Sequence, residues 1–338
     1  MARLHSLTAT LVLCATSSIC HADALIFDGS DASGRRVLMR TEIGGMPETI
    51  GGGIEGRRPR IRPSDGAIAY HSLATELEPA RLMLFGDTRR GAQRRDATAR
   101  EISLDRWVQE REIAWSPDGR HIAFHSQHHE AAGDIFVAEV GDAGLLGVRN
   151  LTAPSGGMLA IEPDVTPDWS PDGKHIALTS YRSGGASIWI FDVDGNHPRA
   201  LTGRGAHGDY FPAWSPDGQL IAFQRNETIR TRIGLIASSG GEPMFLDLPG
   251  NAYQPAFSPD GQRLAVAITF PDGERDLAII ALDGRLLHRI AHPGDDQNPQ
   301  WIDPPTQSAC RQERACLRRG QDGLPSGPQS GDAVHPPR

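Results

Sequence analysis

The sequence predicts an all-β protein, a six-bladed β-propeller whose blades are four-stranded antiparallel sheets. Three observations lead to this prediction: a turn motif recurs at the length of a propeller blade, an apolar strand follows each copy, and helical periodicity is nearly absent. The 38 glycines and 25 prolines among 338 residues agree with a chain of many short strands and tight turns.

The turn motif ends in Ser-Pro-Asp-Gly. Pro presets φ at the first corner of a turn, Asp tolerates the second corner, and Gly takes the left-handed position that follows. The motif therefore predicts a short hairpin between two antiparallel strands. Its copies read IAWSPDG (113–119), PDWSPDG (167–173), PAWSPDG (212–218) and PAFSPDG (255–261), with a weaker copy PRIRPSDG (59–66).

The strands of each blade follow its turn in order. The terminal glycines of successive turns lie 53, 54, 45 and 43 residues apart, which is typical of a four-stranded blade. The predicted second strands are AIAYHS (67–72), HIAFHS (121–126), HIALTS (175–180), LIAFQR (220–225) and RLAVAI (263–268). The predicted third strands are DIFVAEV (134–140), SIWIFDV (187–193), RIGLIAS (232–238) and DLAIIAL (276–282). Fourth strands follow at VRNLTA (148–153), PRALT (198–202), EPMFLDL (242–248) and LLHRIA (286–291).

The two ends of the propeller together supply the closing blade. Residues 24–53 contain ALIFDG, RVLMRT and PETIG, which match strands two to four, and PQWID (299–303) matches a first strand. Trp301 follows Phe257 by 44 residues, and Phe257 follows Trp214 by 43, so the aromatic period continues into this segment. Joining the fragments gives six blades with a three-plus-one closure, which leaves no open sheet edge. The aromatic residues at this period, which also include Trp115 and Trp169, are predicted to pack between blades.

The segments outside the propeller have their own signatures. Residues 1–22 carry one charge, an apolar run and a small-residue site, which predicts a secretory signal peptide cleaved after Ala22. The propeller is assigned to 23–305 and a poorly ordered tail to 306–338. An exported compartment permits a disulfide between Cys310 and Cys316, and the sequence leaves that pairing open.

Composition and charge limit where the protein can be located and which partners it can bind. No later stretch approaches the length of a membrane span, so we expect a periplasmic or secreted monomer with no membrane-spanning segment. A formal net charge of −8 argues against general nucleic-acid binding. Within 57–111 there are 12 arginines against eight acidic residues, which fits either a patch for an acidic partner or a solvated blade face.

The repeated aromatic-Ser-Pro-Asp-Gly core resembles that of the TolB-like six-bladed propellers, over about residues 24–303. Similar blades occur in the periplasmic TolB protein of the Tol-Pal envelope system, in the propeller domains of prolyl-oligopeptidase-type peptidases, and in oligogalacturonate-lyase-like enzymes. The resemblance implies the fold, and its propeller part resembles a Pal-binding surface. The chain departs from TolB because the first strand begins within a few residues of the signal cleavage site, which leaves no room there for an amino-terminal α/β domain.

Six triplets just upstream of the innermost strands are predicted to ring one mouth of the central channel. They are 56–58, 110–112, 164–166, 209–211, 252–254 and 296–298. Aromatic rings beside charged groups suit a peptide or carbohydrate ligand. The predicted ligand-binding residues are Asp164, Asp209, Tyr210, Phe211, Tyr253, Gln254 and Asp296, and the alternative is that they are ordinary solvated loop residues.

A second constellation contains histidines. His71, His125, His128 and His129 lie at or near equivalent places in two neighbouring blades, and imidazoles of this kind can hold a divalent metal. Solvated loop histidines are the alternative. Motifs for a serine nucleophile, a zinc peptidase or a phosphate loop are missing, so we predict no catalytic residue.

Two functions remain in competition at this stage. The first is an exported, non-catalytic propeller, without a cofactor, that binds a protein or a cell-envelope component at the channel mouth. The second is a metal-dependent, polysaccharide-acting enzyme of the oligogalacturonate-lyase-like kind, with the four histidines near its metal.

Overall fold

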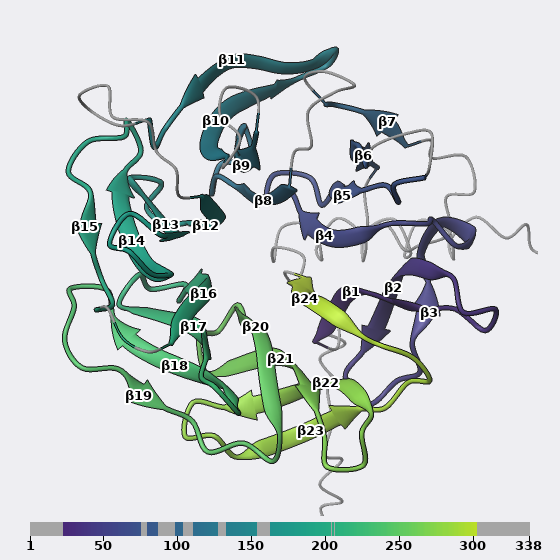
Figure 1. Ribbon diagram of the computed structural model, residues 1–338. Helices are drawn as coiled ribbons and strands as arrows, with labels where there is room; N and C mark the ends of the chain where they lie inside the picture. The colour runs from purple at the N-terminus through teal and green to yellow at the C-terminus, as the bar shows by residue number, and fades with distance from the viewer. Residues whose placement is uncertain are drawn as a thin grey trace, which may run out of the picture.

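Six four-stranded antiparallel sheets stand as blades around a central axis (Figure 1). This computed structural model describes residues 23–75, 80–86, 99–103, 111–127, 133–153, 163–203, 205 and 207–302. The predicted fold class and number of blades are confirmed. Cys310, Cys316, His128 and His129 lie outside the described residues.

Blade 1 closes the ring in the predicted three-plus-one manner. Its innermost strand comes from the carboxyl-terminal side of the propeller and pairs antiparallel with the first strand of the chain, so that Leu25 lies opposite Trp301. In Figure 1 this strand, β24, is the yellow arrow beside the purple β1. The strands of blade 1, from the axis outward, are β24 (Gln297–Ile302), β1 (Ala24–Ser30), β2 (Arg36–Glu42) and β3 (Glu48–Thr49).

The other five blades each use four strands in chain order, with the first strand at the axis. Blade 2 contains β4 (Arg57–Ile61), β5 (Ile68–His71), β6 (Leu82–Phe85) and β7 (Arg100–Glu101). Blade 3 contains β8 (Arg111–Trp115), β9 (His121–Ser126), β10 (Asp134–Gly141) and β11 (Gly144–Asn150). Blade 4 contains β12 (Asp164–Trp169), β13 (His175–Ser180), β14 (Ser187–Asp192) and β15 (Arg199–Ala200). Blade 5 contains β16 (Gly208–Trp214), β17 (Leu220–Asn226), β18 (Thr231–Ala237) and β19 (Met244–Phe245). Blade 6 contains β20 (Asn251–Phe257), β21 (Arg263–Thr269), β22 (Arg275–Ala281) and β23 (Leu286–Ile290).

The Ser-Pro-Asp-Gly turns join first and second strands as predicted. In blade 3 the Ser116 hydroxyl donates to Asp118 Oδ1 at 2.5 Å, and the same carboxylate oxygen accepts the Arg120 N–H at 3.0 Å. Gly119 takes the left-handed conformation, with φ of 69°. Each side chain of the motif therefore satisfies a polar group of its own hairpin, which explains why the motif recurs as a unit.

The apolar core is divided among the gaps between neighbouring blades. Six hydrophobic clusters are found among the described residues, and each one joins two adjacent blades. Trp115, Trp169 and Trp301 belong to three different clusters and are 7 to 8% exposed. Packing between blades, predicted from the aromatic period, is therefore confirmed for these rings.

Helix is almost absent from the described residues, which contain one short 3₁₀ helix, η1 (Ile50–Gly52). Within the same part of the chain, no helix has the length and apolar character needed to cross a membrane.

Candidate binding channel

A bulge interrupts the innermost strand of every blade at the same place. The residue at the bulge has a left-handed backbone with φ between 50° and 54°, although none of the six is glycine. Such a conformation costs a side-chain-bearing residue about 1 to 2 kcal/mol. These six residues, which we name the bulge ring, are Arg58, Glu112, Thr166, Phe211, Gln254 and Asn298.

The bulge ring is held by hydrogen bonds that run from blade to blade. The Thr166 N–H donates to Glu112 Oε2 at 2.8 Å, and the Phe211 N–H donates to Thr166 Oγ1 at 3.3 Å. The N–H groups of Arg58, Gln254 and Asn298 likewise donate to Asp28 Oδ1, Gln224 Oε1 and Gln254 Oε1. These contacts offset the backbone strain, because five of the six N–H groups find a side-chain acceptor on the preceding blade.

All six side chains of the bulge ring line one cavity at the axis. This end of the channel is tight, with a cavity volume of about 40 Å³. Arg58 and Glu112 form an ion pair across it at 2.9 Å. The bulge ring thus occupies the mouth at which the sequence predicted ligand binding.

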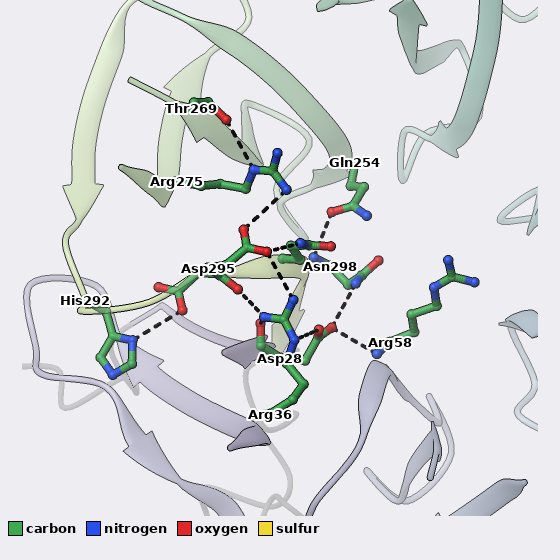
Figure 2. Close-up of polar contacts among 11 residues, drawn as sticks. Asp28, Arg36, Arg58, Gln254, Thr269, Arg275, His292, Asp295 and Asn298 are labelled. Carbon is green, nitrogen blue, oxygen red and sulfur yellow. Dashed lines mark hydrogen bonds and ion pairs between the residues drawn. The ribbon is translucent and has the colours of Figure 1, made fainter. Parts of the chain in front are cut away.

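A polar cluster fixes the closing strand where blades 6, 1 and 2 meet (Figure 2). Asp28 is fully buried, and its Oδ1 accepts both the Arg58 N–H at 2.9 Å and the Asn298 side-chain amide at 2.8 Å. Arg36 Nε lies 3.4 Å from the other oxygen of Asp28. Since Asn298 belongs to β24, these contacts tie the carboxyl-terminal strand to blades 1 and 2.

Asp295 is another acid of the same cluster. Arg36 and Arg275 approach its carboxylate at 3.3 Å and 3.2 Å respectively, and Arg36 also donates to its carbonyl. Figure 2 shows the two guanidinium groups on either side of Asp295. This carboxylate therefore links blade 1 to blade 6.

Asp296 is an acid of the cluster whose pKa is strongly raised. Burial, followed by the neighbouring charge of Asp276, raises its pKa to about 8. Its Oδ1 lies 3.2 Å from His292 Nδ1, while its Oδ2 has no hydrogen-bond partner among the described residues. Burial also lowers the pKa of His292, so this acid and this histidine are both largely neutral near pH 7.

The other predicted ligand-binding aspartates lie inside the blades. Asp164 and Asp209 are 2% and 0% exposed. Asp164 pairs with Arg182 at 2.7 Å, and Asp209 accepts two hydrogen bonds from Arg225 at 2.7 Å and 2.8 Å. Both carboxylates are therefore paired with arginines within the protein.

The predicted aromatic and amide residues occupy two kinds of place. Phe211 and Gln254 belong to the bulge ring and line the cavity, whereas Tyr210 and Tyr253 do not line it. The Tyr210 hydroxyl lies 2.9 Å from that of Tyr181, and the Tyr253 ring lies beneath the Arg275 guanidinium at 4.7 Å.

The two described histidines of the predicted metal set lie within blades. His71 and His125, which are 6% and 5% exposed, are in β5 and β9 and pair in register with Arg57 and Arg111 of the innermost strands. Among the residues that the structure describes, no group of three or more His, Cys, Asp or Glu side chains has an arrangement that could hold a metal ion.

Further along the axis the small bulge-ring cavity meets a second, larger cavity. The side chains that line both the bulge-ring cavity and the cavity beyond it, which we name the channel waist, are Arg60, Asp168, Ala213 and Gln300. Burial raises the pKa of Asp168 to about 7, although the Trp214 N–H donates to it at 2.7 Å. Burial likewise lowers the pKa of Arg60.

The opposite end of the channel, which we name the aromatic mouth, has a cavity volume of about 320 Å³. Its walls are formed by Trp115, Trp214, Phe257 and Trp301, with Pro63, Pro216 and Pro259 of the turn motifs. Sequence reasoning assigned these rings to packing alone and missed that they also line a cavity. The signal was present, because an aromatic residue recurs at the same place on five of the six innermost strands, and equivalent places in a repeat lie at equivalent places around the axis.

Comparison with known proteins agrees with this architecture. Residues 108–247 match the family described as the TolB beta propeller domain. A segment of 70 residues is 36% identical to the Tol-Pal system protein TolB of Alcanivorax borkumensis, and covers 21% of this chain and 14% of that protein. The crystal structure of TolB from Acinetobacter baumannii has a TM-score of 0.66 at 21% identity, over 82% of this chain and 66% of that chain.

The chain is a TolB-like six-bladed propeller. A propeller of this kind is also similar to a Mycobacterium tuberculosis puromycin-hydrolyzing peptidase, with a TM-score of 0.52 at 20% identity over 76% of this chain and 42% of that one. The TolB-like propeller thus spans less than two thirds of the length of each of these proteins. Its fold suggests a binding role.

Proposed function

We propose that this TolB-like propeller is an exported, non-catalytic protein that binds a protein or another cell-envelope component at the bulge-ring end of its channel. The observation that carries the proposal is the bulge ring itself. Six residues of different chemistry, one from each blade, hold a strained backbone conformation and converge on one point. Strained backbone that the surroundings hold in place is a feature of ligand-binding sites.

The size of this end favours a macromolecular partner. A cavity of about 40 Å³ has room for little more than one or two water molecules. A partner would therefore rest on the bulge ring rather than enter it. Phe211 supplies an apolar ring there, and Gln254 and the Arg58–Glu112 pair supply polar groups, a combination that suits a peptide segment.

Export is proposed from the sequence of residues 1–22. Contacts next to the cleavage site support cleavage after Ala22 rather than after Ala24. The Ile43 N–H donates to the Asp23 carbonyl at 2.8 Å, Arg263 pairs with the Asp23 carboxylate, and Ala24 is 4% exposed. Cleavage after Ala24 would remove these contacts.

The test is capture of partners from the cell envelope by crosslinking, with the wild-type protein and with Phe211→Ala and Gln254→Ala. Both variants should lose at least about tenfold in affinity for the captured partner, as expected for residues at the centre of an interface. Met244→Ala is the matched control, because Met244 is exposed on the outermost strand of blade 5, and this variant should bind as the wild type does.

Two outcomes would contradict the proposal. Full affinity of both bulge-ring variants would move the binding surface elsewhere. One tightly held Mn, Ca or Zn per chain in elemental analysis of the purified protein would instead favour the metal-dependent enzyme.

A further inference from the structure

We propose that the aromatic mouth is a second binding site, for a ligand that joins an apolar body to a carboxylate, with the carboxylate placed on Arg60. This site lies at the opposite end of the channel from the bulge ring and goes beyond the proposed function. The proposed site is independent of the partner that binds at the bulge ring.

The walls of the aromatic mouth provide the apolar contact. Trp115, Trp214, Phe257 and Trp301 come from blades 3, 5, 6 and 1, so rings surround the cavity on several sides. A volume of about 320 Å³ falls within the range of about 300 to 1,000 Å³ that is usual for small-ligand sites. Trp214 and Phe257 are half-buried, so their faces are accessible from the cavity.

The Arg60 guanidinium lies at the floor of the cavity, and most of its N–H donors make no hydrogen bond to described residues. An arginine has five N–H donors, whereas Arg60 makes a single side-chain hydrogen bond to described residues, from Nη1 to the Pro59 carbonyl at 3.1 Å. It forms no ion pair with any residue of the described ranges. Most of its donors therefore have no acceptor among the described residues, and Arg60 lines the channel.

The other charges near this mouth are already engaged. Asp168, the acid at the waist, accepts the Trp214 N–H. Its charge also acts on Arg60, but burial raises the pKa of Asp168 to about 7, so it is only partly ionised near neutral pH. The turn aspartates at the rim accept the hydroxyls of their own hairpins, as Asp217 does from Ser215 at 2.6 Å and Asp260 from Ser258 at 2.5 Å.

The rim arginines are engaged too. Arg62 and Arg263 lie over the Trp115 and Trp301 rings at 5.4 Å and 5.1 Å, and each pairs with an aspartate. Arg60 is thus the cation that remains for a ligand.

The chemistry of one buried guanidinium selects the class of ligand. Guanidinium and carboxylate form two parallel hydrogen bonds with matched charge. A phosphate dianion would need a second cation, and a neutral sugar would leave the guanidinium with the partly ionised Asp168 as its main counter-charge. An apolar carboxylate satisfies Arg60 and fills the ring-lined cavity at the same time. Its source is either a free small acid or the carboxyl terminus of a peptide.

The experiment measures binding of defined probes to the mature protein by calorimetry and by quenching of tryptophan fluorescence. The small probes are 3-phenylpropionate and its neutral counterpart 3-phenylpropionamide. The peptide probes are N-acetyl-Ala-Ala-Phe with a free carboxyl group and with a carboxyl-terminal amide. Each acid should bind at least about tenfold more tightly than its amide, because a charge-assisted pair is lost in the amide.

Two variants of strand β4 test whether Arg60 supplies the charge that binds the carboxylate. Arg60→Gln should reduce the affinity for the acids about tenfold or more and leave that for the amides unchanged. Arg57→Gln is the matched control, since it removes the same charge from the same strand at the exposed, opposite end. Melting curves of both variants check folding, and the comparison of acid with amide on the wild-type protein needs no variant.

The outcomes are distinct. Tighter binding of 3-phenylpropionate than of the peptide acid identifies a small acid, and the reverse identifies a peptide terminus; both support the site. Equal affinity for acid and amide, an Arg57→Gln loss as large as that of Arg60→Gln, or no binding at millimolar concentration would overturn it. Failure at this mouth leaves the bulge-ring variants of the proposed function unaffected, so the two failures are distinguishable.

Discussion

The two ends of the channel are built by the same six strands, but a different feature recurs from blade to blade at each end. At the bulge ring the backbone repeats, with φ of 50° to 54° in every blade, while the side chains are all different. At the aromatic mouth the side chains repeat, because Trp or Phe recurs at the blade period. The first end is tight, at about 40 Å³, and the second is open, at about 320 Å³.

This difference shows how a repeat protein separates stability from specificity. The aromatic residues recur because a large ring fills five of the six gaps between blades, while Ile61 takes this place between blades 1 and 2. The bulge backbone is held by hydrogen bonds to side chains of the neighbouring blade, and acceptors as different as Glu112, Thr166 and Gln254 serve this purpose, so the residue type can differ from blade to blade. Variation between blades is therefore found at the end where we propose a macromolecular partner.

The largest expected effect comes from removing the strand that serves both ends. Truncation after Ala291 deletes β24, which carries Asn298 of the bulge ring, Gln300 of the waist and Trp301 of the aromatic mouth. The loss of a strand ladder and of a buried ring should lower the melting temperature by about 10 °C or more. Truncation after Pro305 keeps β24 and serves as the control in the same calorimetric scan. Equal melting temperatures for the two chains would contradict the three-plus-one closure as the source of stability.

A smaller effect separates the two ends from each other. Trp301 is 7% exposed and donates from Nε1 to the Ala256 carbonyl at 3.0 Å, so Trp301→Ala should cost about 3 to 5 kcal/mol in the free energy of unfolding. Phe211 is half-buried at the axis, so Phe211→Ala should cost only about 1 to 2 kcal/mol. Urea denaturation measures both. A cost for Phe211→Ala as large as that for Trp301→Ala would make the bulge ring part of the core and not a binding surface.

The last expected effect is a pH dependence of stability that arises in the cluster behind the bulge ring. The pKa of Asp296 is about 8 in the folded protein, against about 3.9 for an unperturbed aspartate. The folded state therefore binds one more proton than the unfolded state between these values, and this residue makes the free energy of unfolding fall as pH rises from about 4 to 8. The slope for one proton is at most about 1.4 kcal/mol per pH unit.

Asp296→Asn removes that titration. Its stability relative to the wild type should rise between pH 5 and pH 8 by at least about 1 kcal/mol, measured by denaturation at each pH. Asp247→Asn is the control, because the Asp247 side chain is fully exposed, and it should leave the pH profile unchanged. A profile for Asp296→Asn parallel to that of the wild type would show that this carboxyl is ionised in the folded state at neutral pH.

Much of the fold could be predicted from local patterns. The predicted second strands at 121–126 and 175–180 have the bounds observed for β9 and β13. The outermost strands were harder to delimit, since β15 and β19 contain two residues each where longer strands were predicted. In blade 2 the sequence did not identify β6 and β7. A strand of two residues is too short to show the alternation by which a strand is recognised in a sequence.

The candidate site was less accessible to sequence reasoning. The triplets located the bulge ring, because residues at equivalent places in a repeat must lie at equivalent places around the axis. They could not distinguish Phe211, which lines the cavity, from Asp209, which is fully buried against Arg225. The sequence does not show whether an aspartate carboxylate is hydrated or paired with an arginine on the next strand.

The sequence by itself determined the number of blades, the hairpin at each Ser-Pro-Asp-Gly turn and the closure by residues near 301. These follow from turn chemistry and from periodicity, which act between residues close in the chain. Only the tertiary structure decided which end of the channel is wide, and that Arg60 and Asp168 meet at its waist. It also decided that Arg, Glu, Thr, Phe, Gln and Asn all adopt a backbone that favours glycine. The physical reason is that these features depend on hydrogen bonds and contacts supplied by the neighbouring blade, more than forty residues away for Phe211 N–H and Thr166 Oγ1.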